Sequence, residues 1–172
     1  MSRYPEIRAG QRITGQMLTG IQFEEVVKQA ATIRSADPTV SADPDLQFTL
    51  EANATYHVEF FIQYSTTDGA DIKMDWSVPS GASGLRRTAG GKVGTNSTSD
   101  GEWTDMAWRV VNFDTLSRYG DRPGSSQTFA WETGVITTSS GGTLALRWAQ
   151  NASDAGDTEV SAFSYGRLKR VA

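Results

Sequence analysis

The sequence predicts an all-β protein: a β-sandwich or jelly roll of about eight antiparallel strands, preceded by a short, partly helical N-terminal arm. From Leu46 onward, apolar and polar residues alternate with a period of two, which is typical of strands with one buried and one solvated face. Clusters of Gly, Asn, Asp and Ser separate these runs at roughly the 8–12-residue spacing of sandwich strands. Beyond the N-terminal arm there is almost no helical periodicity.

Residues 1–40 are expected to form an attachment arm and linker, and residues 41–172 the β-sandwich domain. In the arm, apolar residues recur near helical spacing from Ile13 onward. Two glycines interrupt that pattern, and each costs roughly 1 kcal/mol of helix stability. We therefore expect a short helix or turn around residues 14–20 and then an extended segment. The stretch SADPTVSADPDLQ follows, and its two Asp-Pro pairs predict turns and exclude helix.

The alternating runs define the expected strands. In the run DIKMDWSV, the phase directs Trp76 into the core and Asp71 and Asp75 to the solvated face. The same reasoning places Trp148 in the core. A long exposed loop rich in Gly, Ser and Thr is expected in the middle of the chain. The expected strands are residues 46–50, 55–64, 71–78, 83–88, 106–116, 126–139, 141–150 and 160–171.

The last run is expected to close the fold. Because it carries core residues, we expect it to lie inside a sheet, between two neighbours. Gly166 is interpreted as a β-bulge within it. Its core candidates are Val160, Ala162, Phe163, Tyr165, Leu168 and Val171.

Two residues of the 55–64 run are predicted to lie at a subunit interface. His57 and Phe61 are out of phase with the core residues of that strand and are expected on its wetter face. An apolar residue on an outer sheet face often marks contact with another subunit. We therefore assign His57 and Phe61 to a contact between copies of the chain.

Composition excludes several classes of function. The chain has 172 residues, a formal net charge of −4 and no basic patch, so nucleic acid is not an expected partner. It has no Cys, which excludes disulfides, thiolate catalysis and Cys-based zinc sites. No apolar run approaches the ~20 residues that cross a bilayer, so membrane insertion is not expected. The N-terminus is too polar for a signal peptide.

The sequence offers little that would support catalysis. His57 is the only histidine, and no G-x-S-x-G nucleophile elbow is present. Asp71 and Asp75 are interpreted as part of a solvated strand face, and Glu102 and Asp105 as surface carboxylates of a loop. We therefore expect a protein that is not an enzyme, with no catalytic or cofactor-binding residues and no cofactor.

The loop NASDAGDTE, residues 151–159, leaves one question open. It offers oxygen atoms of the kind that Ca²⁺ binds, but their spacing does not match an EF-hand. Turn formation alone also explains Asx residues in a hairpin loop. No metal site is predicted, and binding of an ion by this loop stays open. The oxygen donors are Asn151, Asp154, Asp157 and Glu159.

Two tryptophans, Trp103 and Trp108, border the middle loop. Exposed indole rings can stack on a sugar, or they can cover the edge of a sheet. Both interpretations remain open, and these two residues are the candidates for glycan binding.

Four stretches of the chain resemble one family of small structural proteins of tailed bacteriophages and prophages of actinobacteria, of the minor tail type. They are IRAGQRITGQMLTGIQ, TLEANATYHVEFFIQY, ADIKMDWSVPSGASGLR and the C-terminal run from GGTLALRWAQN to the end. The similarity spans nearly the whole chain, and residues 86–106 depart most from the family pattern.

The resemblance implies a virion component with a jelly-roll-like head, a homotrimer of fibre or decoration type. It also implies that the N-terminal stretch attaches the protein to capsid or tail proteins. The implied attachment residues are Arg8, Gln11, Arg12, Ile13, Met17 and Leu18.

The expected function is therefore that of a non-enzymatic virion structural protein, made in the cytoplasm of a bacterial host and located in the virion. Its expected partners are other virion proteins and further copies of itself. The alternative is a carbohydrate-binding module that contacts a receptor on the host surface.

Overall fold

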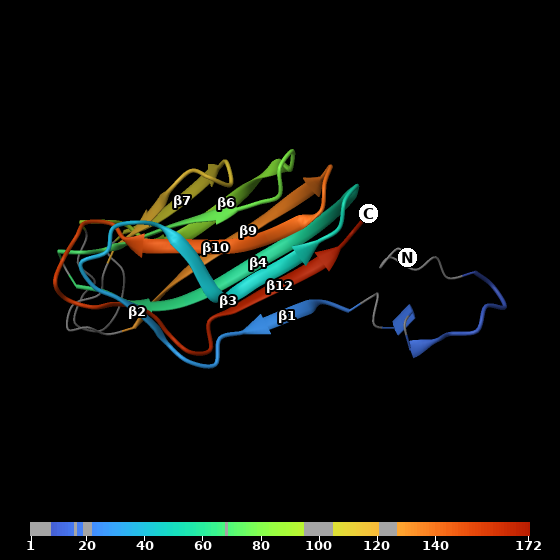
Figure 1. Cartoon of the computed structure of the whole chain (residues 1–172), viewed down its shortest axis with the longest axis horizontal. Coiled ribbons are helices and arrows are strands. Elements are labelled where there is room, and N and C mark those ends of the chain that lie inside the picture. Colours follow the sequence, from blue (N-terminus) through green and yellow to red (C-terminus); the bar gives the residue numbers. More distant parts are fainter. Residues whose placement is uncertain (1–7, 16, 19–21, 68, 95–104, 121–126) are drawn as a thin grey trace.

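The protein is all-β, as predicted, and its two antiparallel sheets pack face to face (Figure 1). The computed structural model describes residues 8–15, 17–18, 22–67, 69–94, 105–120 and 127–172. The large sheet has the strand order β1-β12-β4-β9-β6-β7, and β11 and β2 extend it beside β4. The small sheet has the order β3-β10-β5-β8.

Within the described residues there are twelve strands rather than about eight. The additional ones have only three or four residues, which is too short for alternation to be recognised. The strands are β1 (Glu24–Val27), β2 (Thr32–Arg34), β3 (Ser41–Leu50), β4 (Ala54–Ser65), β5 (Ile72–Ser77), β6 (Ser83–Gly91), β7 (Met106–Val111), β8 (Ser117–Tyr119), β9 (Thr128–Thr138), β10 (Gly142–Gln150), β11 (Thr158–Val160) and β12 (Tyr165–Arg170).

The core lies between the sheets, and strict alternation builds it. Along β4, every second residue from Ala54 to Tyr64 is buried, while the residues between them are half-buried on the outer face. Trp76 and Trp148 are 1% and 0% exposed, which confirms their predicted place in the core. The ring of Phe60 meets Trp76 edge to face at 5.3 Å. The hydrophobic effect of this burial is the main force that holds the two sheets together.

The last strand has two neighbours, as predicted: β12 pairs with β1 on one side and β4 on the other. Gly166 is not a bulge, because it pairs in regular register with Phe60. Its role is close packing: a Cβ atom at Gly166 would lie 2.8 Å from Phe60 and 2.9 Å from Phe48. Three predicted core residues are wrong. Phe163 is 78% exposed in a turn with positive φ, and Val171 is 42% exposed. Tyr165 is half-buried on the outer face of the sheet, opposite Phe61, because its phase in β12 is that of the outward residues.

The second Asp-Pro pair lies within a strand, contrary to the prediction of a turn there. Asp43 and Pro44 belong to β3, where the pairing with β10 shifts register. The Asp43 carboxylate is fully buried: Oδ1 is 3.1 Å from Lys28 Nζ, and Oδ2 accepts a hydrogen bond from Trp148 Nε1 at 3.0 Å. Lys28 Nζ also reaches Asp45 at 2.8 Å. This network explains how an irregular strand segment is held and ties the chain after β1 to the core.

The prediction that Asp71 and Asp75 are solvated is also wrong. Asp75 is 2% exposed and Asp71 8%. Asp75 accepts two hydrogen bonds from the guanidinium of Arg147, at 2.8 and 2.6 Å. That hydrogen bonding raises the pKa of Arg147. A cross-strand pair with an arginine therefore allows a carboxylate to be buried where the phase of β5 alone predicted solvent.

Residues 8–15, 17 and 18 lie apart from the sandwich (Figure 1). Two segments of the predicted arm and linker, β1 and β2, are strands of the large sheet. Farther toward the N-terminus, the Thr14 carbonyl accepts hydrogen bonds from the amides of Met17 and Leu18, which makes one helical turn. The described residues of that segment are exposed, apart from Met17, which is half-buried.

Candidate interaction surface

The outer face of the large sheet carries a row of apolar side chains that crosses six strands. Cross-strand register places these residues opposite one another, one from each of β1, β12, β4, β9, β6 and β7. In spatial order the row, called here the aromatic row, is Val27, Tyr165, Phe61, Trp131, Ala89 and Trp108. An apolar row of this length on a sheet's outer face is a candidate protein-contact surface.

The aromatic row is ordered at its centre by ring stacking. Phe61 stacks on Phe129, with ring centroids 5.5 Å apart and ring planes 10° apart. On its other side it stacks on Tyr165, at 5.6 Å and 15°. Offset stacking of this kind stabilises the arrangement beyond the burial of area. Because both faces of the Phe61 ring are covered, this ring presents its edge outward and offers no open platform for a sugar.

A second row, called here the charged row, runs beside the aromatic row. It alternates in sign over most of its length, and the Arg167–Glu25 ion pair within it has an N–O distance of 2.7 Å. Burial and the nearby Glu59 charge raise the pKa of Tyr165, so its hydroxyl stays neutral and donates to Glu59 at 3.5 Å. In spatial order the charged row is Glu25, Arg167, Glu59, Thr133, Arg87 and Val110.

The structure places His57 and Phe61 together on this outer face, in the phase that the sequence predicts. Both are half-buried. His57 Nε2 lies 3.2 Å from Thr133 Oγ1, a contact to a neighbouring strand of the same sheet. Their assignment to a subunit interface stays a prediction.

Trp108 is 69% exposed at the end of the aromatic row, on β7, which pairs with β6 at the edge of the sheet. Stacking on a sugar and covering the edge of the sheet both stay predictions for Trp108. Trp103, the second predicted glycan-binding residue, lies outside the described residues.

The predicted attachment residues form a separate, open segment. Ile13 is 60% exposed and Leu18 50%. The Gln11 side chain accepts a hydrogen bond from the Arg8 amide and donates a weak one to Met17 Sδ. Arg12, the remaining predicted residue, is exposed. Apolar side chains exposed on this segment are available to another protein.

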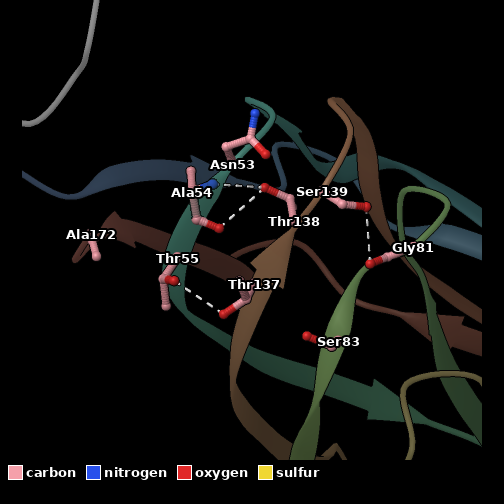
Figure 2. Close-up of a pocket in the computed structure, with 9 residues that line it drawn as sticks. All are labelled: Asn53, Ala54, Thr55, Gly81, Ser83, Thr137, Thr138, Ser139 and Ala172. Carbon is pink, nitrogen blue, oxygen red and sulfur yellow. Dashed lines mark hydrogen bonds between the residues drawn. The ribbon is translucent and has the colours of Figure 1, made fainter.

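A small notch lies at one end of the sandwich, where β4, β6 and β9 meet (Figure 2). It encloses about 320 Å³, and no side chain that lines it is titratable. Thr138 Oγ1 donates to the Ala54 carbonyl and Ser139 Oγ to the Gly81 carbonyl, so these hydroxyls already bind backbone. The notch is lined by Asn53, Ala54, Thr55, Gly81, Ser83, Thr137, Thr138, Ser139 and Ala172.

The remaining polar candidates have structural partners. Asp154 accepts hydrogen bonds from Thr67 Oγ1 and from the Gly156 amide, which orders the 151–159 loop. In the described part of the chain, no three His, Cys, Asp or Glu side chains gather as a metal site would require. Asp105 pairs with Lys92 at 2.8 Å, and Glu102 lies outside the described residues. Nor is any described helix long and apolar enough to cross a membrane.

Local sequence patterns did not predict most of the exposed apolar surface. Leu85, Val110, Phe129, Trp131 and Val135 are each between 37% and 62% exposed on the outer face. A signal was present, because apolar residues on both phases of a strand, as in TFAWETGVI, indicate two faces that avoid water. Their convergence on one surface required the strand order.

No protein-family model matches the chain, and no curated protein sequence matches it significantly. Among solved structures, it is similar to the tripod (BppUct-A-L) from the baseplate of bacteriophage Tuc2009. The TM-score is 0.35 and the identity 10%, over 96% of this chain and 73% of that one. A structure of infectious bursal disease virus, Gx strain, matches with a TM-score of 0.20 and 9% identity, over 88% of this chain and 37% of that one. Both likenesses are weak, and no functional inference is drawn from them.

Proposed function

We propose that this chain is a non-enzymatic structural protein of a bacteriophage virion, of minor tail, fibre or capsid-decoration type. Its N-terminal arm binds other virion proteins, and its β-domain associates as a homotrimer and projects from the particle. The observation that carries the proposal is where the apolar groups are exposed: on a sheet face and on an extended arm, both suited to protein contacts.

The distribution of charge supports this proposal. In three ion pairs a buried charge joins distant segments of the chain: Lys28 with Asp43, Arg86 with Glu132, and Asp75 with Arg147. Pairs of this kind satisfy buried charges and hold a scaffold. The resemblance of the sequence to phage structural proteins along nearly its whole length supplies the virion context.

The arm is tested by incorporation into particles. Deletion of residues 1–20 should leave a folded β-domain, checked by circular dichroism, that no longer incorporates into purified virions. The matched control is the full-length chain with Ser83 changed to Ala, since Ser83 lies in the β-domain and not in the arm. Normal incorporation of the deletion would refute the role of the arm.

A second function, carbohydrate binding at the host surface, is favoured by one observation: the 69% exposure of Trp108. Aromatic rings on a trimer would bind glycans weakly one by one and gain avidity together. A glycan array probed with the wild-type chain and with Trp108→Ala tests this. Binding that the substitution removes supports it, and a blank array beside a positive control excludes it.

A further inference from the structure

The outer face of the large sheet has two unlike halves. Over β9, β6 and β7 it is apolar; this half, called here the apolar half, consists of Leu85, Trp108, Val110, Phe129, Trp131 and Val135, with Arg87 among them. Over β1, β12 and β4 it carries charges around the stacked rings; this half, called here the charged half, consists of Glu25, Arg167, Lys169, Glu59, His57, Phe61 and Tyr165. β7 and β1 lie at opposite edges of the sheet (Figure 1), so the halves lie side by side.

The area of the apolar half is that of a specific interface. Its six apolar side chains are 37% to 69% exposed. Together they offer roughly 600 Å² of apolar surface, if a whole aromatic side chain offers about 250 Å² and an aliphatic one somewhat less. A standard interface buries about 800 Å² on each partner, of which somewhat more than half is apolar. The apolar half therefore supplies the apolar area that one side of a stable complex needs.

The charges of Arg87 and Glu59 indicate that the apolar half binds the charged half of another copy. Arg87 and Glu59 lie in the same charged row with Thr133 between them. Two strand spacings, about 10 Å, separate them, which is too far for an ion pair within one chain. Among the described residues, neither has an ion-pair partner, and Arg167 is already occupied by Glu25. When the apolar half lies on the charged half of a neighbour, Arg87 of one copy meets Glu59 of the other.

We propose that this contact, the apolar half of one copy on the charged half of a second copy, is the self-association interface of the protein. Trp108 and Val110 then pack over the stacked rings of Phe61 and Tyr165, and Arg87 pairs with Glu59. Because both halves lie on one face, two copies placed face to face make this contact twice about a two-fold axis, whereas three copies that each make it once, head-to-tail, close a ring. The choice of a second copy as occupant rests on the proposed function.

A charge exchange tests the contact in the full-length chain. Arg87→Glu and Glu59→Arg should each weaken association at least about tenfold, because each places like charges together across the interface. The double variant Arg87→Glu/Glu59→Arg should restore association to within a few-fold of wild type. Trp108→Glu should abolish it in the micromolar range. Association is measured by size-exclusion chromatography with light scattering and by sedimentation velocity, and folding by circular dichroism.

The matched control is Arg118→Glu, an equal charge change at an exposed position on β8 of the small sheet. It should leave association unchanged. A wild-type chain that stays monomeric throughout the micromolar range overturns the inference. So does a double variant that fails to recover while its single variants are folded.

Failure of the proposed function has a different signature. If the chain forms a dimer that the single charge variants disrupt and the double variant restores, the contact is supported and the homotrimer is refuted. If the chain self-associates through this contact but is absent from purified particles, the contact is supported and the virion role is refuted.

Discussion

The ion pair between Arg86 and Glu132 makes a sharp test of how this sandwich is held together. Both side chains are fully buried between the sheets, and Arg86 Nη1 lies 2.6 Å from Glu132 Oε1. Nη1 makes no hydrogen bond of good geometry, so this contact acts through charge. Arg86 also donates from Nη2 to the Met74 carbonyl at 3.1 Å and to the Thr115 carbonyl. The arginine thus joins β6 to β5 and to the segment before β8.

The carboxylate of Glu132 has two further donors. Trp76 Nε1 donates to Oε2 at 2.6 Å, and the Tyr119 hydroxyl donates to Oε1 at 2.5 Å. Arg86→Met removes the positive charge and leaves the carboxylate buried with these two neutral donors. An orphaned buried charge costs about 3–5 kcal/mol. For a chain of this length the melting temperature should fall by roughly 6–20 °C.

The free energy of unfolding is measured by urea titration, with tryptophan fluorescence and circular dichroism as the two signals. Trp76, which donates to Glu132, reports on the surroundings of this ion pair. The control is Lys92→Met, which breaks a pair whose side chains are 53% and 46% exposed. It should change stability by less than about 1 kcal/mol. The double variant Arg86→Met/Glu132→Met should be more stable than Arg86→Met, because it removes the orphaned charge.

Two results would refute the reasoning. The first is an Arg86→Met chain as stable as the Lys92→Met control. The second is a double variant less stable than Arg86→Met, since the penalty would then come from lost packing rather than from a buried charge.

Three more predictions concern single residues. Burial, and then the adjacent carboxylate, raise the pKa of Tyr119 well above its ordinary value of 10.0. Its neutral form therefore contributes stability that is complete below about pH 10 and is lost as the pH rises further. Tyr119→Phe should make this alkaline loss of stability smaller, as measured by urea titrations at several pH values. Gly166→Ala should lower stability by about 1–3 kcal/mol in thermal unfolding, because its Cβ would lie 2.8 and 2.9 Å from two phenyl rings. The control is Gly15→Ala, whose Cβ would have no neighbour within 4 Å and which should leave stability unchanged. Lys28→Met leaves the Asp43 carboxylate without its cation and should destabilise the chain by about 3–5 kcal/mol. Amide hydrogen exchange should become faster in β1 and β2. Unchanged exchange in these strands would contradict the anchoring role of Lys28.

Alternation in the sequence was enough to predict the main strands. The 55–64 and 126–139 runs became β4 and β9, the two long central strands, because a half-buried strand must repeat every second residue. The phase of Trp76 and Trp148 was equally reliable. The short strands were missed because three or four residues carry too little pattern.

Three of the errors have one cause: the place of a residue depends on partners that are distant in sequence. Asp75 has the phase of a solvated residue, but an arginine 72 positions later allows it to be buried. Asp43 resembles part of a turn, but Lys28 and Trp148 hold it inside a strand. Gly166 suggests a bulge until the two phenyl rings beside it are known.

The candidate surface was predictable only in part. The phase of β4 identified His57 and Phe61 as outward residues, but the exposed apolar area lies mainly on β9, β6 and β7. The order of strands in the large sheet brings these side chains together, and local patterns do not contain that order.

By itself, the sequence determined that this chain is all-β and which side chains of most of its long strands face inward. These properties follow from residue-to-residue periodicity, because burial on one face of a strand is a local constraint. Only the tertiary structure decided which strands are neighbours, which charges are buried, and that apolar side chains from six strands align on one face. Such features depend on cross-strand register between distant segments, where the free energy of pairing and packing is set by contacts that no local pattern records.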